Sequence, residues 1–135
     1  MKKATEKKYR SRIDAVVKAE RLAGKVTKKL KISEPERVDI CIAVTEAVNN
    51  AVEHGNKMLN DKFVTLLFEY SDDKLRITVE DQGEGFDLEA VENPLSPENL
   101  TKPNGRGLLI VDALMDNVEV SSSTTGTKVI MIKKR

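Results

Sequence analysis

Two pairs of alternating segments constrain the fold of this chain most strongly. Residues 62–70 are rich in β-branched and aromatic side chains, and the polar turn 71–74 separates them from residues 75–79, where apolar and polar side chains alternate. A period of two is typical of half-buried strands, and two such strands joined by a short polar turn predict an antiparallel hairpin. Residues 118–122 and 127–132 predict a second hairpin in the same way.

Helical patterns fill the intervals around these hairpins. Residues 13–30 place apolar side chains every three to four positions, which predicts a helix. A second helix is expected over residues 33–54, because Ser33 and Glu36 form a capping-box pattern at its start. A short helix over residues 108–115 follows the long aperiodic stretch between the hairpins. The expected apolar stripe of the second helix consists of Val38, Cys41, Ile42, Val48 and Val52.

The order of these elements predicts an α+β fold. Hairpins imply antiparallel pairing, and helices that cover one face of the sheet complete a two-layer sandwich. The length of 135 residues and the 39% of hydrophobic residues are those of a single domain, 1–135. Residues 1–9 are expected to be flexible, since they are locally basic and lie at a terminus.

Composition argues against several function classes. The formal net charge is only +1, aromatic residues make up 4% of the chain and Trp is absent, so we expect neither nucleic-acid binding nor membrane association. No apolar run is long enough to span a bilayer and no signal peptide is visible, which predicts a cytoplasmic protein. The single Cys41 and the single His54 make a zinc site built by the protein improbable.

The segment 45–55 carries the first candidate site. Glu46 and Asn50 are four positions apart, so they lie on one face of the expected helix. A carboxylate and an amide oxygen at this spacing can position a hard cation together with a water or hydroxyl group. Taken alone, such a pair is more often part of a solvated helix face.

Asp81 ends the second strand and is followed by the glycines Gly83 and Gly85. A carboxylate can accept a hydrogen bond from the exocyclic amine of adenine, whereas guanine presents an acceptor at that position. The glycines permit tight turns and the close approach of a flat ligand. An ordinary Asp-Gly turn is the alternative for this segment alone.

A glycine motif, Gly105-Arg106-Gly107, stands directly before the expected helix 108–115. Unpaired N–H groups and partial positive charge at a helix N-terminus favour phosphate, and Arg106 adds a cation that can meet a terminal phosphate. A helix-entry loop with a solvated arginine is the alternative, because a lone G-x-G is a weak signal.

Together these segments carry a family resemblance. The acidic-amide helix, the strand-end Asp81, the long loop, the glycine motif and Gly126-Thr127 occur in an order that resembles the nucleotide-binding fold of gyrase-type ATPases, Hsp90 chaperones, histidine kinases and MutL proteins. The resemblance covers residues 10–135 and implies a Bergerat-type ATP-binding fold with a mixed, mostly antiparallel sheet. The segments T-E-A-V-x-N-A-V-x-H-G and G-R-G-L-L-I-V-D-A-L-M-D are most similar to small bacterial anti-sigma factors with serine kinase activity.

The resemblance assigns roles to single residues. It implies that Glu46 is the catalytic base, that Asn50 holds Mg²⁺, and that Asp81 reads adenine with Gly83 and Gly85 beside it. Thr127 matches a threonine that helps to hold the adenine end. Residues 88–106 are expected to form an ATP lid. The phosphate-proximal residues are expected to be Gly105, Arg106, Gly107 and Leu108.

The activity implied by the resemblance is that of an ATP-dependent protein serine/threonine kinase. Such a protein phosphorylates a small anti-anti-sigma antagonist, otherwise sequesters a sigma factor, and forms a homodimer. A histidine kinase is disfavoured because the only histidine, His54, lies inside the nucleotide motif, where a capping or packing role is expected. The alternative is a non-catalytic switch that binds ATP or ADP and a partner without phosphorylating it.

Overall fold

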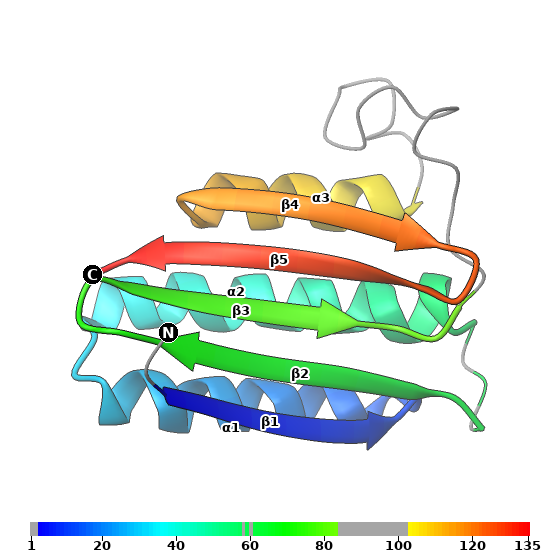
Figure 1. Ribbon diagram of the computed structural model, residues 1–135, viewed down its shortest axis with the longest axis horizontal. Helices are drawn as coiled ribbons and strands as arrows, with labels where there is room; N and C mark the ends of the chain where they lie inside the picture. The colour runs from blue at the N-terminus through cyan, green and yellow to red at the C-terminus, as the bar shows by residue number, and fades with distance from the viewer. Residues whose placement is uncertain (1–2, 58, 60, 84–102) are drawn as a thin grey trace.

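The computed structural model describes residues 3–57, 59, 61–83 and 103–135. Gly85 and residues 88–102 of the expected lid lie outside the described residues. The described part is a two-layer α+β arrangement, which confirms the expected fold class (Figure 1).

A five-stranded sheet forms one layer, with the strand order β1-β2-β3-β5-β4. All four ladders between the described strands are antiparallel, so the parallel component of the expected mixed sheet is absent from this part of the chain. The central contact is the ladder between β3 and β5, which joins the two predicted hairpins. The strands are β1 (Lys3–Arg10), β2 (Phe63–Tyr70), β3 (Lys74–Glu80), β4 (Asn117–Ser123) and β5 (Gly126–Lys134).

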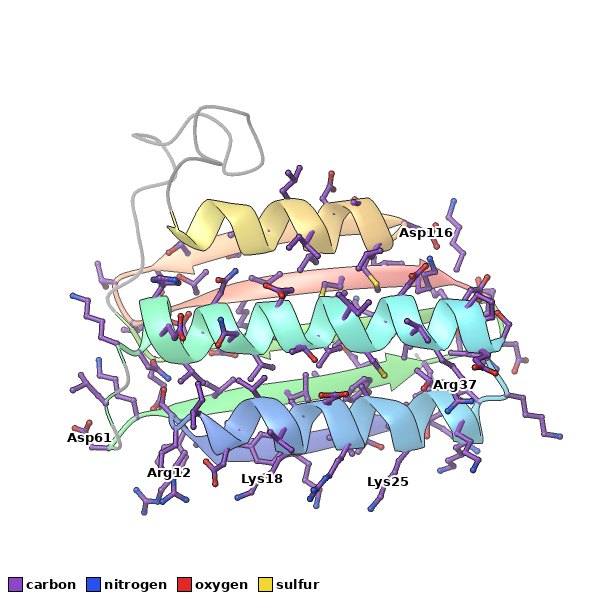
Figure 2. All side chains as sticks on the ribbon, turned by 180° about the vertical axis from the view of Figure 1, so that it is seen from behind. Arg12, Lys18, Lys25, Arg37, Asp61 and Asp116 are labelled. Atoms are coloured by element: carbon purple, nitrogen blue, oxygen red, sulfur yellow. The ribbon has the colours of Figure 1, made fainter. Side chains whose placement is uncertain are left out.

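The helices form the second layer and all cover the same face of the sheet. Seen from behind, they lie side by side, with α2 between α1 and α3 (Figure 2). No helix in the described ranges is long and apolar enough to cross a membrane. The helical elements are α1 (Asp14–Lys29), α2 (Glu34–Asn50), the π-helical turn η1 (Ala51–Gly55) and α3 (Pro103–Leu114).

The core lies between the two layers and follows from the alternation in the strands. Every second residue of β2 and β3 is buried, as the period of two requires. The α1 residues that face these strands are the small Ala15, Ala19 and Ala23, which allow the helix backbone to approach the sheet. Val64, Leu66, Phe68, Leu75 and Ile77 are completely buried.

The expected apolar stripe of α2 is partly wrong. Val38 is 51% exposed and Ile42 is 42% exposed, whereas Ile40 and Ala43 are fully buried. The inward face follows the three- and four-residue steps Ile40, Ala43, Val44, Ala47 and Val48, because α2 packs between α1 and α3 as well as on the sheet. Small alanines on this face permit that packing, so the larger apolar side chains of α2 do not by themselves mark its buried face.

The expectations for the N-terminal residues and for the start of α2 both need correction. Residues 3–10 form the edge strand β1 and pair with β2 from Lys3↔Tyr70 to Arg10↔Phe63, so this part of the segment expected to be flexible is ordered. Backbone hydrogen bonds to a buried strand outweigh the local charge, and Arg10 also lies over the Phe63 ring, 5.2 Å from its centroid. Ser33 occupies the N-cap position of α2, but its side chain makes no capping hydrogen bond.

Candidate functional site

The site begins where α2 changes its hydrogen-bond pattern. After Asn50 the helix continues as the π-helical turn η1, and the N–H of Asn56 donates to the carbonyl oxygen of Ala51 at 2.8 Å. This bond spans five residues instead of four and widens the last turn. Such π turns are rare and frequent at functional sites. Here the turn brings Gly55 against the end of β3.

Asp81 stands directly after β3 and is only 6% exposed. Its Oδ1 accepts hydrogen bonds from the N–H of Gly83 at 2.9 Å and from the N–H of Thr127 at 3.2 Å. Its own N–H donates to the carbonyl oxygen of Thr127 at 2.9 Å. Within the described part of the chain no group donates to Oδ2, so this oxygen remains available as an acceptor.

Burial is the main influence on the Asp81 carboxyl and raises its pKa. The N–H groups of Gly83 and Thr127 counteract this by favouring the carboxylate. The neighbouring Glu80 raises the pKa further, and Lys62 lowers it. Asp81 is thus a largely desolvated carboxyl group whose Oδ1 is hydrogen-bonded, whereas its Oδ2 has no hydrogen-bond donor among the described residues.

Three glycines enclose Asp81 so closely that no side chain fits. A Cβ built on Gly55 would overlap Oδ2 of Asp81, and one built on Gly83 would overlap the carbonyl oxygen of Gly55. Gly126 has a φ of +154°, and its Cβ would overlap the carbonyl oxygen of Asp81. The backbone segments around Asp81 therefore approach so closely that only glycine, whose side chain is a hydrogen atom, fits at these three positions. Gly83 was a predicted site residue, whereas Gly55 and Gly126 stood only in the segments that carry the family resemblance.

A side-chain network that the sequence did not reveal holds the same region. Asn56 is fully buried; its Nδ2 donates to the carbonyl oxygen of Phe63 at 2.9 Å, and its Oδ1 accepts from the N–H of Gln82 at 2.7 Å. Gln82 Oε1 accepts from the N–H of Phe63 at 2.7 Å, and Lys62 Nζ donates to the carbonyl oxygen of Gln82 at 3.0 Å. The only sequence signal was an asparagine directly after the T-E-A-V-x-N-A-V-x-H-G motif.

Glu46 and Asn50 lie on α2, one turn apart as predicted and both half-buried. Among the described residues, no hydrogen-bond or ion-pair partner holds the Glu46 carboxylate. Thr45 beside it is tied to its own helix, since its Oγ1 donates to the carbonyl oxygen of Cys41 at 2.7 Å. Glu46 is therefore positioned by the helix backbone alone in this part of the chain.

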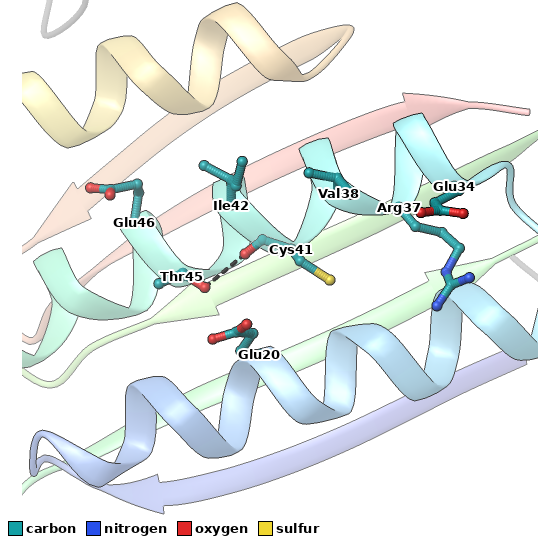
Figure 3. Close-up of a pocket in the computed structure, with 8 residues that line it drawn as sticks. All are labelled: Glu20, Glu34, Arg37, Val38, Cys41, Ile42, Thr45 and Glu46. Carbon is teal, nitrogen blue, oxygen red and sulfur yellow. Dashed lines mark hydrogen bonds between the residues drawn. The ribbon is translucent and has the colours of Figure 1, made fainter.

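Glu46 also ends a groove of about 650 Å³ on the outer surface of α1 and α2 (Figure 3). The groove combines the exposed apolar side chains Val38 and Ile42 with three carboxylates and one guanidinium. Asp81 does not line it. Cys41, expected in the apolar stripe of this helix, is half-buried in the groove wall, and burial raises the pKa of its thiol. The lining residues are Glu20, Glu34, Arg37, Val38, Cys41, Ile42, Thr45 and Glu46.

The glycine motif lies inside a helix and not before it. Helix α3 begins at Pro103 instead of the expected residue 108, which places Gly105, Arg106 and Gly107 in its first turns. In a helix that begins at Pro103, Gly105 lies among the first residues whose N–H groups lack a partner within the helix, whereas Gly107 does not, so only the start of the motif keeps the property expected of a phosphate site. Leu108 is 7% exposed and belongs to the core, where it anchors α3.

The remaining predicted residues are placed as follows. Thr127 Oγ1 lies 3.0 Å from Ser122 Oγ, and the Thr127 backbone holds Asp81 as described above. His54 Nε2 lies 3.8 Å from Glu53 Oε2 on the surface, so the expected capping or packing role has no counterpart among the described contacts. Gly85 falls outside the described residues.

The donors available for a metal ion are few. The described residues contain no group of three or more His, Cys, Asp or Glu side chains that could hold one. The predicted Mg²⁺ site therefore requires Asn50 together with oxygens of a bound phosphate. This fits the preference of Mg²⁺ for oxygen ligands, few of which come from protein when a nucleotide is bound.

Comparison with known proteins identifies the family of this chain. The model of the histidine kinase-like ATPase domain family matches residues 9–133. A serine-protein kinase RsbW of Staphylococcus epidermidis is 40% identical over 102 residues, which cover 70% of this chain and 64% of that relative. An anti-sigma F factor of Clostridium perfringens is 39% identical over 104 residues, which cover 73% of each protein. The chain thus spans less than two thirds of the RsbW relative.

Solved structures show the same fold. The RsbU and RsbW domains of a Mycobacterium tuberculosis protein match with a TM-score of 0.74 and 18% identity, over 98% of this chain and 33% of that one. A histidine kinase domain from a blue-light activated histidine kinase of Erythrobacter litoralis matches with a TM-score of 0.57 and 27% identity, over 73% of this chain and 47% of that one. At 18% identity the first match bears on the fold alone.

Proposed function

This chain belongs to the histidine kinase-like ATPase domain family, and from that premise we propose that it is an ATP-dependent serine kinase and an anti-sigma factor. Its substrate is a small anti-anti-sigma antagonist protein, and it sequesters a sigma factor when the antagonist is phosphorylated. The names of the relatives, serine-protein kinase RsbW and anti-sigma F factor, support this assignment.

The single observation that carries the proposal is that only one oxygen of the buried Asp81 carboxylate is hydrogen-bonded by the described protein. Two backbone N–H groups donate to Oδ1, whereas Oδ2 receives no hydrogen bond from the described residues, and Asp81 is only 6% exposed. An adenine amine donates to Oδ2, whereas the guanine oxygen at the same position would face it as a second acceptor. The close packing of Gly55, Gly83 and Gly126 around Asp81 holds this carboxylate in place.

The phosphate end is assigned to α2 and the start of α3. The first-turn N–H groups of α3 and the Arg106 cation would bind phosphate oxygens, and Asn50 would hold Mg²⁺. When bound, Mg²⁺ neutralises charge that develops on the phosphate oxygens. Glu46 then takes the proton of the incoming serine hydroxyl. The serine oxygen bonds to the γ-phosphorus, the bond to the bridging oxygen breaks, and ADP leaves.

One observation favours the alternative function, a switch that binds ATP or ADP without phosphoryl transfer. Glu46 has no partner among the described residues that would orient it as a base. A passive switch requires the Asp81 end of the site but not a positioned Glu46. The two functions therefore differ in what the loss of Glu46 changes.

A phosphotransfer assay separates them. The protein is incubated with labelled ATP, Mg²⁺ and candidate antagonist proteins from the same genome, and the label is located by mass spectrometry. The kinase proposal expects phosphoserine on one antagonist, its loss in Glu46→Gln, and unchanged ATP affinity in that variant. Glu36→Gln, an exposed change on the same helix, is the control and should keep full activity. Nucleotide binding without any phosphoserine would leave the switch as the function.

Two further assignments rest on the family alone. We place the protein in the cytoplasm, where a sigma factor is available, and we expect it to act as a homodimer. Sedimentation equilibrium of the purified chain, with and without ATP, measures the second expectation directly. A monomer at all concentrations up to those of the binding assays would contradict it.

A further inference from the structure

We infer that Asn56 is a positioning residue for adenine recognition, because it clamps the end of α2 to the end of β3 and so fixes Asp81. The inference rests on the proposed function, in which Oδ2 of Asp81 reads the base. Asn56 does not touch the proposed adenine position itself. It acts through Gly55, which precedes it in the chain, and through Gln82, to which it is hydrogen-bonded.

The clamp consists of three hydrogen bonds from one fully buried residue. The Asn56 N–H closes the π turn on Ala51 at 2.8 Å, and Nδ2 reaches the carbonyl oxygen of Phe63 at 2.9 Å. Oδ1 accepts from the N–H of Gln82 at 2.7 Å. Asn56 therefore joins the end of α2, the start of β2 and the segment after β3.

The clamp acts next to the two residues that meet in the site. Gly55 directly precedes Asn56, and Asp81 directly precedes Gln82. Gly55 packs on Oδ2 of Asp81 with no room for a side chain. The hydrogen bond between Asn56 and Gln82 thus joins the residue that follows Gly55 to the residue that follows Asp81. Without the bond, Gly55 can move from Asp81, and water can reach Oδ2.

An amide suits this position because it needs one donor and one acceptor. Phe63 offers a carbonyl oxygen and Gln82 offers an N–H group, so a side chain that only donates or only accepts leaves one buried group unpaired. The Gln82 side chain adds a second tie, from its Oε1 to the N–H of Phe63, but it lies on the exposed side. The buried amide is therefore the less replaceable of the two links.

The first experiment separates positioning from stability. The Kd values for ATP and GTP are measured by calorimetry for the full chain and for Asn56→Ala, and Tm is measured alongside. We expect an ATP Kd about tenfold higher in the variant, because both side-chain hydrogen bonds of the clamp are lost, and a smaller preference for ATP over GTP. The matched control is Thr27→Ala, since Thr27 is also fully buried and hydrogen-bonded, to the carbonyl oxygen of Ala23 at 2.7 Å. It should lower Tm and leave the preference unchanged.

A second variant keeps the inference testable if Asn56→Ala does not fold. In Asn56→Asp the ionised carboxylate faces the carbonyl oxygen of Phe63, whereas the protonated form can donate to it and still accept from Gln82. The ATP Kd of Asn56→Asp, divided by that of the unchanged chain at the same pH, should therefore fall toward one as the pH is lowered. The division removes the titration of Asp81 and the charge of Lys62, which both proteins share.

Three results would overturn the inference. A lower Tm in Asn56→Ala with unchanged ATP affinity and unchanged ATP preference would make Asn56 a purely structural residue. A ratio that does not change with pH in Asn56→Asp would show that the donor to Phe63 is irrelevant to binding. If the unchanged chain binds ATP and GTP equally or not at all, the proposed function itself fails, because Asp81 then reads no base.

Discussion

The two ends of the proposed nucleotide site differ in how completely the described protein builds them. At the adenine end, Asp81 is buried, two N–H groups fix one oxygen, and glycines pack against it. At the phosphate end, Glu46 is half-buried on a helix surface without a partner in the described ranges. Recognition of adenine requires a hydrogen-bond acceptor in a fixed place. A carboxylate that takes a proton from the serine of another protein must instead remain accessible to that protein. The contrast predicts that changes at the two ends affect different quantities.

The largest effect is expected when a methyl group is placed at the adenine end. Gly55→Ala puts a Cβ onto Oδ2 of Asp81, and the overlap must be relieved by moving one of the two segments. Overpacking costs about 1–3 kcal/mol, so the ATP Kd should rise by about ten- to a hundredfold. Calorimetric titration with ATP measures the change.

The matched control is the same substitution where space is open. A Cβ on Gly24 meets nothing within 4 Å, and Gly24 lies inside α1. Gly24→Ala should therefore leave ATP affinity unchanged and raise the free energy of unfolding by about 0.5–1 kcal/mol. Equal ATP affinity in the two variants would refute the tight packing at Asp81.

A somewhat smaller effect is expected from Asp81→Asn, which keeps the shape and exchanges one acceptor for a donor. Oδ1 still receives the N–H groups of Gly83 and Thr127, so the new amide nitrogen takes the place of Oδ2. It opposes the adenine amine and matches the guanine oxygen. We expect about tenfold weaker ATP binding and a shift of preference toward GTP.

Asp72→Asn is the control, since Asp72 is exposed in the turn between β2 and β3. Glu46→Gln sharpens the comparison, because it removes phosphotransfer but should keep the ATP Kd. A loss of ATP affinity in Glu46→Gln as large as that in Asp81→Asn would mean that the two ends do not divide recognition and chemistry.

An intermediate effect is expected from pH. Burial raises the pKa of Asp81, so the folded protein takes up this proton at a higher pH than the unfolded chain. The ionised carboxylate therefore reduces stability above its folded-state pKa, and this penalty is relieved as the pH falls through that value toward the unfolded one. Over the same window the ATP affinity should fall, because a proton on Oδ2 turns the acceptor into a donor.

Stability and affinity should thus change in opposite directions at Asp81. Tm without nucleotide and the ATP Kd are measured across the acidic range for the unchanged chain and for Asp81→Asn. The difference between the two proteins isolates this carboxyl group from the others. ATP affinity that falls with pH equally in both proteins would assign the effect to another residue.

The smallest effect is expected from Lys62→Ala. Lys62 Nζ donates to the carbonyl oxygen of Gln82 at 3.0 Å on the exposed side of the network, and exposed contacts of this kind contribute little. The ATP Kd should change by about twofold or less. A change as large as that of Asn56→Ala would shift the clamp from the buried amide to the exposed lysine.

Much of the fold was predictable because the strand signals are local. The alternation in residues 75–79 and in the final hairpin gives β3 and β5 directly, and the family resemblance built on Asp81 and the glycine motif is confirmed for the family. Pairing partners were less visible. Residues 3–10 carry charges typical of a flexible end, and only the neighbouring β2 turns them into a strand.

The candidate site was predicted in part, for a physical reason. Asp81 and Gly83 were singled out by their residue types, and the structure joins them by a hydrogen bond. Asn56 and the tight packing of Gly55 could not be identified in this way, because both depend on how closely two backbones approach after folding. Similarly, the start of α3 at Pro103 was missed because a glycine motif is typical of a loop. The roles of all predicted site residues toward a nucleotide stay predictions; these residues are Glu46, Asn50, Asp81, Gly83, Gly85, Gly105, Arg106, Gly107, Leu108 and Thr127.

The bond between Asp81 and Thr127 also bears on how the molecule folds. Each hairpin closes through neighbours in the chain, whereas this contact spans 46 residues and joins one hairpin to the other. Loop closure over such a distance is slow compared with hairpin formation. During synthesis the adenine end cannot exist until Thr127 has left the ribosome. Nucleotide binding should therefore appear late on the folding pathway, and an ATP analogue added to a refolding reaction would report on the last step of assembly.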